Sequence, residues 1–409
     1  MSNDGSGLVL AGLKVIDFSR LLPGPWAAQM LGDLGAEVTK IEALDSGDPS
    51  RHNPPDFQTT SVYFHSVNGN KRGLGLDIRH PDGKRIADRL LADADVVIES
   101  FRPDVARRLG IDYPSVQPVN PRVVYASFSG YGQTGPLAGV PGHDLVIQAM
   151  SGHMGAPNHR AGDAKIPEVP TFQAADYAGA SMGTIGLLAA IMKQRATGVG
   201  SYLDISLFDS LVYMSKVAHT ESLARRAGKT VDQRIEVYGG NPRYATYATG
   251  DGKAIAVSFL EARVWAHFCR HIDRPDLIDA SEGPDARHTT HGERATLYRG
   301  VIADYCRART RDELCAELEA AQIPICPIYS PDEALDSPQA TARGLVWDVA
   351  HPTEGSIPLL ANPLGRSGLV REQRTPSPSR IGGDSEAILR ELGFDSSDYE
   401  RLRKDGVVA

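Results

Sequence analysis

Two side chains that can transfer protons lie at turns in front of expected helices. His143 is in PGHDLVIQAMSG, after a Gly- and Pro-rich turn, and Asp176 is in the apolar stretch FQAADYAGA. An imidazole titrates near neutral pH, while burial raises the pKa of a carboxyl and a helix N-terminus lowers it. Both residues could act as acid or base, and Asp176 could also act as a nucleophile. The simpler interpretation is structural, with Asp176 as a helix cap and His143 as part of a turn.

A glycine pattern next to His143 offers a competing interpretation. Gly130, Gly132 and Gly135 form Gly-x-Gly-x-x-Gly after an expected strand. A dinucleotide site of this kind needs a helix N-terminus directly afterwards to hold the pyrophosphate. Prolines at 136 and 141 occupy that place instead, so no helix begins before about residue 143. The glycines therefore indicate turns.

Alternating strands and helices must position these residues. LKVIDFS (13–19) is expected to be a strand, WAAQMLGDLG a helix, and AEVTKIE the next strand. DVVIES (95–100) and RVVYASFS (122–129) are further expected strands. This alternation predicts an α/β fold with a parallel sheet covered by helices. DYAGASMGTIGLLAAIMK (176–193) is expected to be a buried helix whose small residues let other backbones approach closely.

The chain is long enough, at 409 residues, for more than one domain. Its composition becomes polar and Gly-rich near 225–243, where we place a boundary. We expect a large domain over 1–225, a smaller α+β domain over 226–330, and a connector with a C-terminal segment over 331–409.

Charge and composition argue against several classes of protein. The net charge of −8 argues against general nucleic-acid binding, although one polyanionic small ligand needs only a local basic cluster. We expect a cytoplasmic protein, because no stretch resembles a secretory signal or a full membrane span. The four cysteines have no Cys-x-x-Cys spacing, so we expect neither a metal site nor a disulfide framework.

Many ordered segments together resemble the family III CoA-transferases, a superfamily that also contains racemases. The matching segments are GLKVIDFSRLLPGPWAAQMLGDLGAEVTKIE, NGNKRGLGLDIRHPDGK, DVVIESFRPDVARRLG, NPRVVYASFSGYGQTGP, GHDLVIQAMSG, QAADYAGASMGTIGLLAAI, GGNPRYATYATGDGKAIAVSFLEARVW and IGGDSEAILRELGF. The resemblance implies an interlocked homodimer of ring-shaped chains, each with a large Rossmann-like domain and a small domain. It also implies that residues after about 330 return to the large domain.

The resemblance further implies a substrate and a set of catalytic residues. Coenzyme A would be present as part of the thioester substrate, with no tightly bound cofactor. Asp176 matches the carboxylate that is the nucleophile of the transferases and an acid/base of the racemases. His143 matches the second acid/base of the racemases, and Glu261 matches the glutamate that hydrogen-bonds that histidine. A helix-start glutamate facing solvent is the simpler interpretation of Glu261.

Basic residues from two matching segments are expected to hold the phosphates of coenzyme A, because arginine pairs bidentately with phosphate and lysine supplies a point charge. These residues are Lys71, Arg72, Arg102, Arg107 and Arg108. Arg108 matches a family contact best. Many relatives have an arginine where this chain has Ala43, so one end of the coenzyme is expected to be held differently.

Two reactions fit this set of residues. In the first, His143 and Asp176 exchange the α-proton of a 2-methyl-branched acyl-CoA from opposite faces, which racemises it. In the second, Asp176 carries CoA from a donor thioester to a carboxylic acid through an anhydride and an aspartyl-CoA thioester. His143, Glu261 and Leu22 favour racemisation, whereas LVIQAMSG resembles the transferases. We expect racemisation, with CoA transfer as the alternative.

Overall fold

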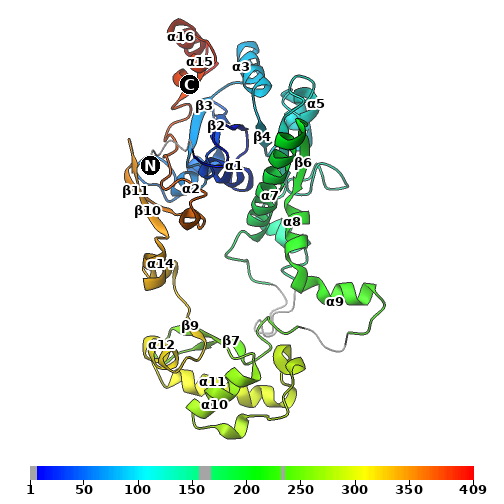
Figure 1. Cartoon of the computed structure of the whole chain (residues 1–409), viewed down its shortest axis with the longest axis vertical. Coiled ribbons are helices and arrows are strands. Elements are labelled where there is room, and N and C mark those ends of the chain that lie inside the picture. Colours follow the sequence, from blue (N-terminus) through cyan, green and yellow to red (C-terminus); the bar gives the residue numbers. More distant parts are fainter. Residues whose placement is uncertain (1–6, 156–166, 232–234) are drawn as a thin grey trace. The chain divides into compact units, whose positions relative to one another are not determined.

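The computed structural model describes residues 7–155, 167–231 and 235–409. The chain divides into two compact units, and Figure 1 labels many of the elements of both. The large unit comprises Met1–Ser151, Pro170–Met214 and Pro338–Ala409, and the second unit comprises Gly152–Val169 and Ser215–Ser337. The expected division at 225 and 330 differs from this one in three places, because Gly152–Val169, the helix α9 (Lys216–Arg226) and residues 331–337 belong to the second unit.

A six-stranded sheet is the centre of the large unit, with the order β3-β2-β1-β4-β5-β6 and every neighbouring pair parallel. Its strands are β1 (Lys14–Asp17), β2 (Glu37–Glu42), β3 (Lys71–Gly75), β4 (Val96–Glu99), β5 (Val124–Ser129) and β6 (Ser201–Ser206). The predicted α/β fold with a parallel sheet is confirmed. The strand order reverses between β1 and β4, where doubly wound folds bind ligands beyond the carboxyl ends of the strands.

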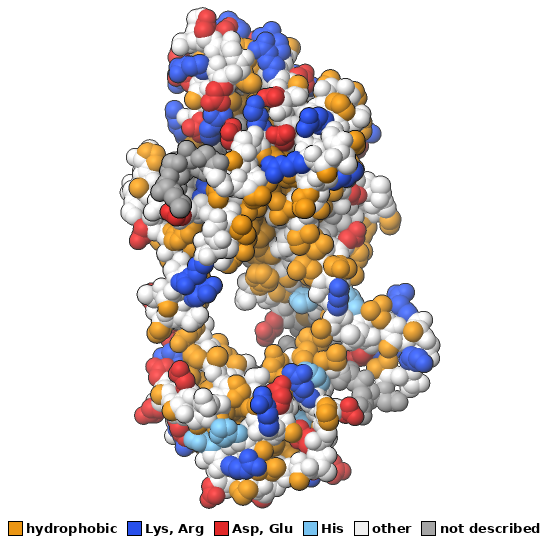
Figure 2. Space-filling view, viewed as in Figure 1, with side chains coloured by type: hydrophobic (Ala, Val, Ile, Leu, Met, Phe, Trp, Pro, Cys, Tyr) orange, Lys and Arg blue, Asp and Glu red, His pale blue; other side chains and the backbone are white. Residues whose placement is uncertain are grey.

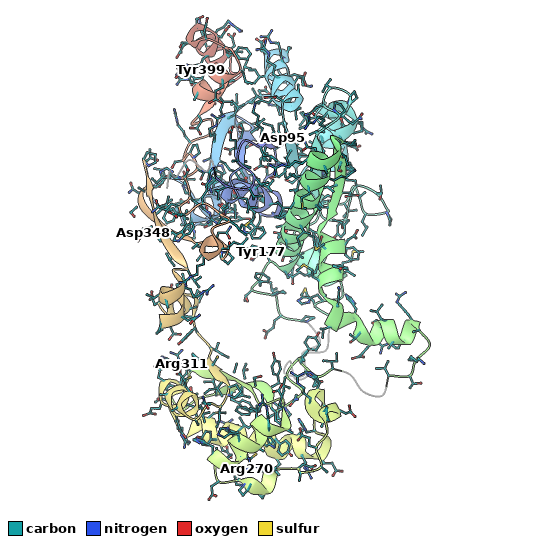
Figure 3. All side chains as sticks on the ribbon, in the orientation of Figure 1. Asp95, Tyr177, Arg270, Arg311, Asp348 and Tyr399 are labelled. Atoms are coloured by element: carbon teal, nitrogen blue, oxygen red, sulfur yellow. The ribbon has the colours of Figure 1, made fainter. Side chains whose placement is uncertain are left out.

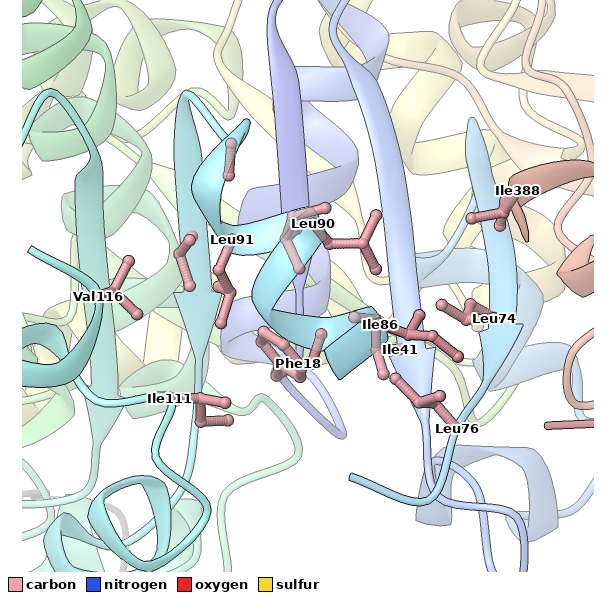
Figure 4. Close-up of a cluster of buried hydrophobic side chains, with 14 of the residues drawn as sticks. Phe18, Ile41, Leu74, Leu76, Ile86, Leu90, Leu91, Ile111, Val116 and Ile388 are labelled. Atoms are coloured by element: carbon pink, nitrogen blue, oxygen red, sulfur yellow. The ribbon is translucent and has the colours of Figure 1, made fainter. Parts of the chain in front are cut away.

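Helices cover both faces of this sheet, because alternate strand residues point to opposite sides. Ile16 and Leu74 pack with α3 (Pro81–Ala92) in one buried cluster, which Figure 4 shows in part. Val15 and Val38 pack on the other side with α1 (Pro23–Asp33). Each such side chain stabilises the fold by roughly 1.5–3 kcal/mol when fully buried. The other short helices of this part are α2 (Val62–Val67), α4 (Pro103–Arg108), α5 (Tyr113–Val116), α6 (Asp144–Met150) and α8 (Leu207–Met214).

Helix α7 (Ala174–Thr197) is the long helix expected from its small residues. It packs on α1, α8, β5 and β6, and Gly198 ends it in the left-handed conformation that glycine tolerates. By length and composition α7 passes the test for a membrane span, but half of the tested window is buried inside the protein. Such burial is typical of a core helix.

The second unit has its own core beneath a three-stranded antiparallel sheet, β7-β8-β9. Trp265, Phe268 and Tyr298 are among its buried aromatic residues. Besides α9, its elements are β7 (Tyr244–Ala248), β8 (Ala254–Ser258), β9 (Ile325–Pro327), α10 (Ala262–His271), α11 (Ala295–Arg307), α12 (Arg311–Ala320) and α13 (Pro331–Leu335).

The C-terminal segment belongs to the large unit and contacts its first elements. Arg374 forms two hydrogen bonds with the Asp33 carboxylate, at 3.0 and 2.8 Å. Val407 and Val408 are buried in the cluster that includes Leu74. The elements of this segment are α14 (Pro338–Arg343), the hairpin β10 (Val346–His351) and β11 (Gly355–Leu360), α15 (Ser385–Glu391) and α16 (Ser396–Lys404).

Candidate active site

Asp176 is the third residue of α7 and is partly buried. Desolvation and, to a smaller extent, the negative charge of Asp144 together raise its pKa to about 7. Within the described residues, no hydrogen bond to the Asp176 carboxyl is present. A carboxyl in this state can exchange a proton near neutral pH, and its anion is a stronger base than an ordinary carboxylate.

Asp144 caps the helix that carries Asp176. Its Oδ1 accepts hydrogen bonds from the backbone N–H groups of Ala175, at 2.8 Å, and Asp176, at 3.2 Å. The N–H groups of residues 174 and 177 donate to the carbonyls of Phe172 and Gln173. The backbone donors at the start of α7 are therefore occupied, by a carboxylate from another helix and by local carbonyls.

Gln148, on α6, fixes the orientation of the Asp144 carboxylate. Its Nε2 donates to Asp144 Oδ2 at 2.5 Å and to the Phe172 carbonyl at 2.9 Å. The Gln148 side chain is buried. The side-chain amide of Gln148 thus connects the Asp144 carboxylate to Phe172, just before α7.

Aromatic side chains gather at this end of α7. Tyr177, which Figure 3 labels, stacks on Phe172 with ring centroids 5.1 Å apart and meets the edge of Trp26 at 6.0 Å. Burial raises the pKa of the Tyr63 phenol, and the charge of Asp176 adds to that effect. The carboxyl of Asp176 therefore lies near the phenols of Tyr63 and Tyr177.

His143 immediately precedes α6 and is exposed. Its carbonyl accepts the N–H groups of Val146 and Ile147, whereas its side chain makes no capping bond. His143 is the sequence neighbour of Asp144, whose carboxylate accepts a hydrogen bond from the first turn of α7. The described hydrogen bonds do not join His143 to Asp176, so proton exchange by this pair stays a prediction.

Glu261 lies in the second unit, at the position before α10. Its carboxylate forms an ion pair with Arg287 at 2.8 Å, and both side chains are partly exposed. Its side chain does not cap the helix. A hydrogen bond in which the His143 ring donates to the Glu261 carboxylate stays a prediction.

Lys71 differs from the role expected for it. Its side chain is buried, and Nζ donates to Asp17 Oδ2, the Pro25 carbonyl and Asn68 Oδ1, each at 2.8 Å. These bonds use all three ammonium protons, so none is left for a phosphate. Lys71 instead joins the start of β3 to the end of β1, to the first turn of α1 and to Asn68.

The four arginines of the expected phosphate site lie on the surface or close to it. Arg72 forms a bidentate pair with Glu391 at 2.6 and 2.7 Å, and Arg107 pairs with Asp104. Arg102 and Arg108 flank α4 and are exposed, with no ion pair among the described residues. The face in Figure 2 mixes Lys and Arg with Asp and Glu side chains and has no uniformly basic surface.

One further basic residue was missed in the sequence. Arg20 follows β1, and its guanidinium lies over the Phe101 ring, 5.1 Å from the centroid. Phe101 and Arg102 follow β4, the strand beside β1. The signal was available, since a basic residue directly after the first strand of a doubly wound sheet stands at the ligand-binding edge.

Among the described residues, no group of three or more His, Cys, Asp or Glu side chains could hold a metal ion. The cysteines are free thiols: Cys269, Cys306, Cys315 and Cys326. Burial raises the pKa of Cys269 and Cys306 to about 12, which leaves these thiols protonated at neutral pH.

Comparisons with known proteins agree on one family. The sequence model of CoA-transferase family III matches residues 10–385. Succinyl-CoA:glutarate CoA-transferase of Mus musculus is 31% identical over 406 residues, covering 98% of this chain and 90% of that protein. Acetyl-CoA:oxalate CoA-transferase of Acetobacter aceti is 29% identical, with 93% and 95% covered. The crystal structure of a CAIB/BAIF family protein from Brucella suis has a TM-score of 0.78 at 29% identity, with 94% and 99% covered.

Proposed function

Because the chain belongs to CoA-transferase family III, we propose that it moves coenzyme A from an acyl-CoA donor to a carboxylic acid, with Asp176 as the nucleophile. The observation that carries this proposal is the state of Asp176. Its carboxyl is desolvated, has a pKa raised to about 7 and makes no described hydrogen bond. Such a carboxylate is more nucleophilic than one that is solvated or paired.

The comparisons favour transfer over racemisation. Both curated relatives described above are named CoA-transferases, so the racemase interpretation drawn from His143, Glu261 and Leu22 has no support from them. The pairing of Glu261 with Arg287 gives it no support either. We therefore place the transferase alternative first.

The reaction needs only acyl chemistry at one carboxylate. Asp176 attacks the donor thioester carbonyl, and CoA leaves as a thiolate, which forms an aspartyl acyl anhydride. The thiolate attacks the aspartyl carbonyl, which releases the donor acid and leaves an aspartyl-CoA thioester. The acceptor carboxylate and the thiolate then repeat these steps in reverse order, which forms the new acyl-CoA and regenerates Asp176. No electrons, water or tightly bound cofactor enter the balance.

We place the phosphates of coenzyme A near the carboxyl ends of β1 and β4. Arg102 and Arg108 are exposed there without ion pairs, and Arg20 lies over Phe101 beside them. Arg72 and Arg107 would first have to leave Glu391 and Asp104. Lys71 is not included, since its donors are used within the fold.

We also propose a homodimer in the cytoplasm, in keeping with the family resemblance. A chain of 44.0 kDa should then sediment in analytical ultracentrifugation at about twice its own mass. A monomer at micromolar concentration would contradict the dimer without affecting the assignment of Asp176.

The reaction can be tested with a panel of acids taken from the names of the relatives. Succinyl-CoA and acetyl-CoA serve as donors, glutarate and oxalate as acceptors, and mass spectrometry detects new acyl-CoA products. Hydroxylamine added during turnover should convert Asp176 to a hydroxamate, whereas Asp176→Asn should give neither product nor label. Deuterium incorporation at the α-carbon of a 2-methylacyl-CoA in deuterated water, without transfer to any acid, would restore the racemase interpretation.

A further inference from the structure

We propose that Asp144 is a positioning residue for the nucleophile: its carboxylate holds the first turn of α7 and keeps a fixed negative charge beside Asp176. The inference rests on the proposed function of Asp176, and it adds a residue that acts on the nucleophile from a different helix. It is drawn from the hydrogen bonds at the α6–α7 contact.

The geometry of the contact is that of a cap supplied from outside the helix. Gln173 occupies the position before α7 and makes no side-chain capping bond. Asp144 instead reaches the N–H groups of Ala175 and Asp176 from 31 and 32 residues away in sequence. Since the cap binds the N–H of Asp176 itself, any movement of Asp144 moves the backbone that carries the nucleophile.

Gln148 makes this cap rigid. Nε2 of Gln148 donates to both Asp144 Oδ2 and the carbonyl of Phe172, which lies two residues before the start of α7. The Asp144 carboxylate is thus held on both oxygens. A side chain held this firmly fixes the orientation of the turn more precisely than a solvent-exposed cap does.

The charge of Asp144 has a second effect on Asp176. A helix N-terminus normally stabilises a nearby anion, but here another carboxylate already binds its N–H groups. Desolvation and the Asp144 charge both disfavour ionisation of Asp176 and raise its pKa. The other titratable groups whose charge couples to Asp176 are the phenols of Tyr63 on α2 and Tyr177 on α7, while His143 is exposed at the start of α6. A more basic carboxylate is a better nucleophile once it is ionised.

Asp144→Asn separates the charge from the hydrogen bonds, because an amide oxygen can still accept from both N–H groups. We measure carbodiimide labelling of Asp176 in the ligand-free protein as a function of pH, by peptide mass spectrometry. The half-labelling pH should lie near 7 in the wild type and should fall by on the order of one pH unit in Asp144→Asn. The acidic limb of the pH profile of kcat/KM, which reports the free enzyme, should move in the same direction.

Asp395→Asn is the matched control. Asp395 Oδ1 also accepts two backbone N–H groups at the start of a helix, those of Ser397 and Asp398, at 2.8 and 2.9 Å. Its loss should change neither the labelling of Asp176 nor the pH profile. Asp144→Ser, which is also neutral and supplies a capping oxygen, repeats the test if Asp144→Asn does not fold.

Truncation tests the positioning role. Asp144→Ala removes the hydrogen bonds as well as the charge, and kcat should fall by roughly 100-fold with KM for the acyl-CoA nearly unchanged. Asp144→Asn keeps the hydrogen bonds, so its kcat should be close to that of the wild type at a pH at which Asp176 is fully ionised in both proteins. A merely structural cap would lower the amount of folded enzyme without moving the pH profile.

The outcomes distinguish this inference from the proposed function. If wild-type Asp176 is never trapped by hydroxylamine during turnover, the proposed function is wrong. If it is trapped, but folded Asp144→Asn and Asp144→Ser leave the half-labelling pH and the acidic limb unchanged, the role given to Asp144 is wrong.

Discussion

Asp176 links the reactivity of the protein to its stability. Its pKa in the folded protein, about 7, lies above its ordinary value of 3.8, so the folded state binds the proton more tightly than the unfolded state does. The stability associated with that proton is complete below about pH 4 and is lost as the pH rises through about 7. The difference corresponds to roughly 4 kcal/mol at full ionisation.

Replacing Asp176 with asparagine should therefore stabilise the protein at alkaline pH while it abolishes transfer, because the amide resembles the protonated carboxyl. Urea unfolding at pH 4 should give nearly equal free energies of unfolding for the two proteins. The variant should be more stable at pH 8, by up to roughly 4 kcal/mol. Parallel pH dependences for the wild type and Asp176→Asn would contradict the raised pKa.

The same pKa sets the pH dependence of catalysis in the free enzyme. Only the ionised carboxylate attacks a thioester, so kcat/KM should rise with pH through about 7. Initial rates with acetyl-CoA and oxalate between pH 5 and 9 measure this limb. A limb near pH 4, as for a solvated aspartate, would show that Asp176 is not desolvated in the active enzyme.

Asp176 could be predicted from the sequence as a functional residue, but the residue that caps its helix could not. An aspartate near the start of an apolar helix is visible in FQAADYAGA. The cap comes from Asp144, on another helix, through bonds that no local pattern encodes. For the same reason the occupied donors at the start of α7 were not foreseen. The predicted phosphate contact of Lys71 rested on its polar sequence surroundings, which are typical of an exposed lysine. The fold instead buries its ammonium group among three acceptors.

At the scale of elements, α7 lies close against the sheet because glycines face its neighbours. A Cβ added at Gly183 would meet the Phe128 ring of β5, and one at Gly179 would lie 2.9 Å from Leu207 Cγ. Gly186, one turn further along, has its nearest such neighbour at 3.6 Å, which is an ordinary contact. The spacing of these glycines sets how closely the helix that carries Asp176 approaches β5.

Gly183→Ala should destabilise the large unit by about 1–3 kcal/mol, because Phe128 is buried and has to shift. The start of α7 should shift with it, which lowers kcat. Gly186→Ala is the control and should be neutral or slightly stabilising, since alanine favours helix. Thermal unfolding and transfer rates measure both variants, and equal behaviour of the two would contradict the close packing.

Strands with continuous apolar runs were predictable, and β3 was not. The expected strands at 13–19, 95–100 and 122–129 contain β1, β4 and β5. The sequence of β3, KRGLG, has two charges and two glycines, so it lacks the pattern of a buried strand. It is buried because the C-terminal segment covers it, with Pro378 3.4 Å from a Cβ placed on Gly73. That contact spans three hundred residues of sequence.

At the scale of the whole molecule, two ion pairs join the first part of the chain to its last part in different surroundings. Arg374 and Asp33 are buried, and the Arg374 guanidinium also donates to the Leu360 carbonyl. Arg72 and Glu391 form an equally short pair, but both side chains are about half exposed. Burial, and not distance, decides what each pair contributes.

Arg374→Ala should cost about 3–5 kcal/mol, because it leaves the buried Asp33 carboxylate without its cation. Arg72→Ala should cost less than about 1 kcal/mol, since solvent replaces the exposed pair. Urea unfolding at neutral pH measures both free energies. Similar losses of unfolding free energy in the two variants would mean that the buried pair with Asp33 does not hold the C-terminal segment more strongly than the exposed pair does.

The return of the C-terminal segment also determines when the protein can finish folding during synthesis. Val407 and Val408 lie in the same buried cluster as Leu74 and Ile16, so this core lacks part of its packing until residues 407 and 408 have been synthesised. The second unit has its own core within residues 245–325 and does not have to wait. A nascent chain stalled before residue 407 would therefore carry a complete core in the second unit, while the large unit still exposes apolar surface to chaperones.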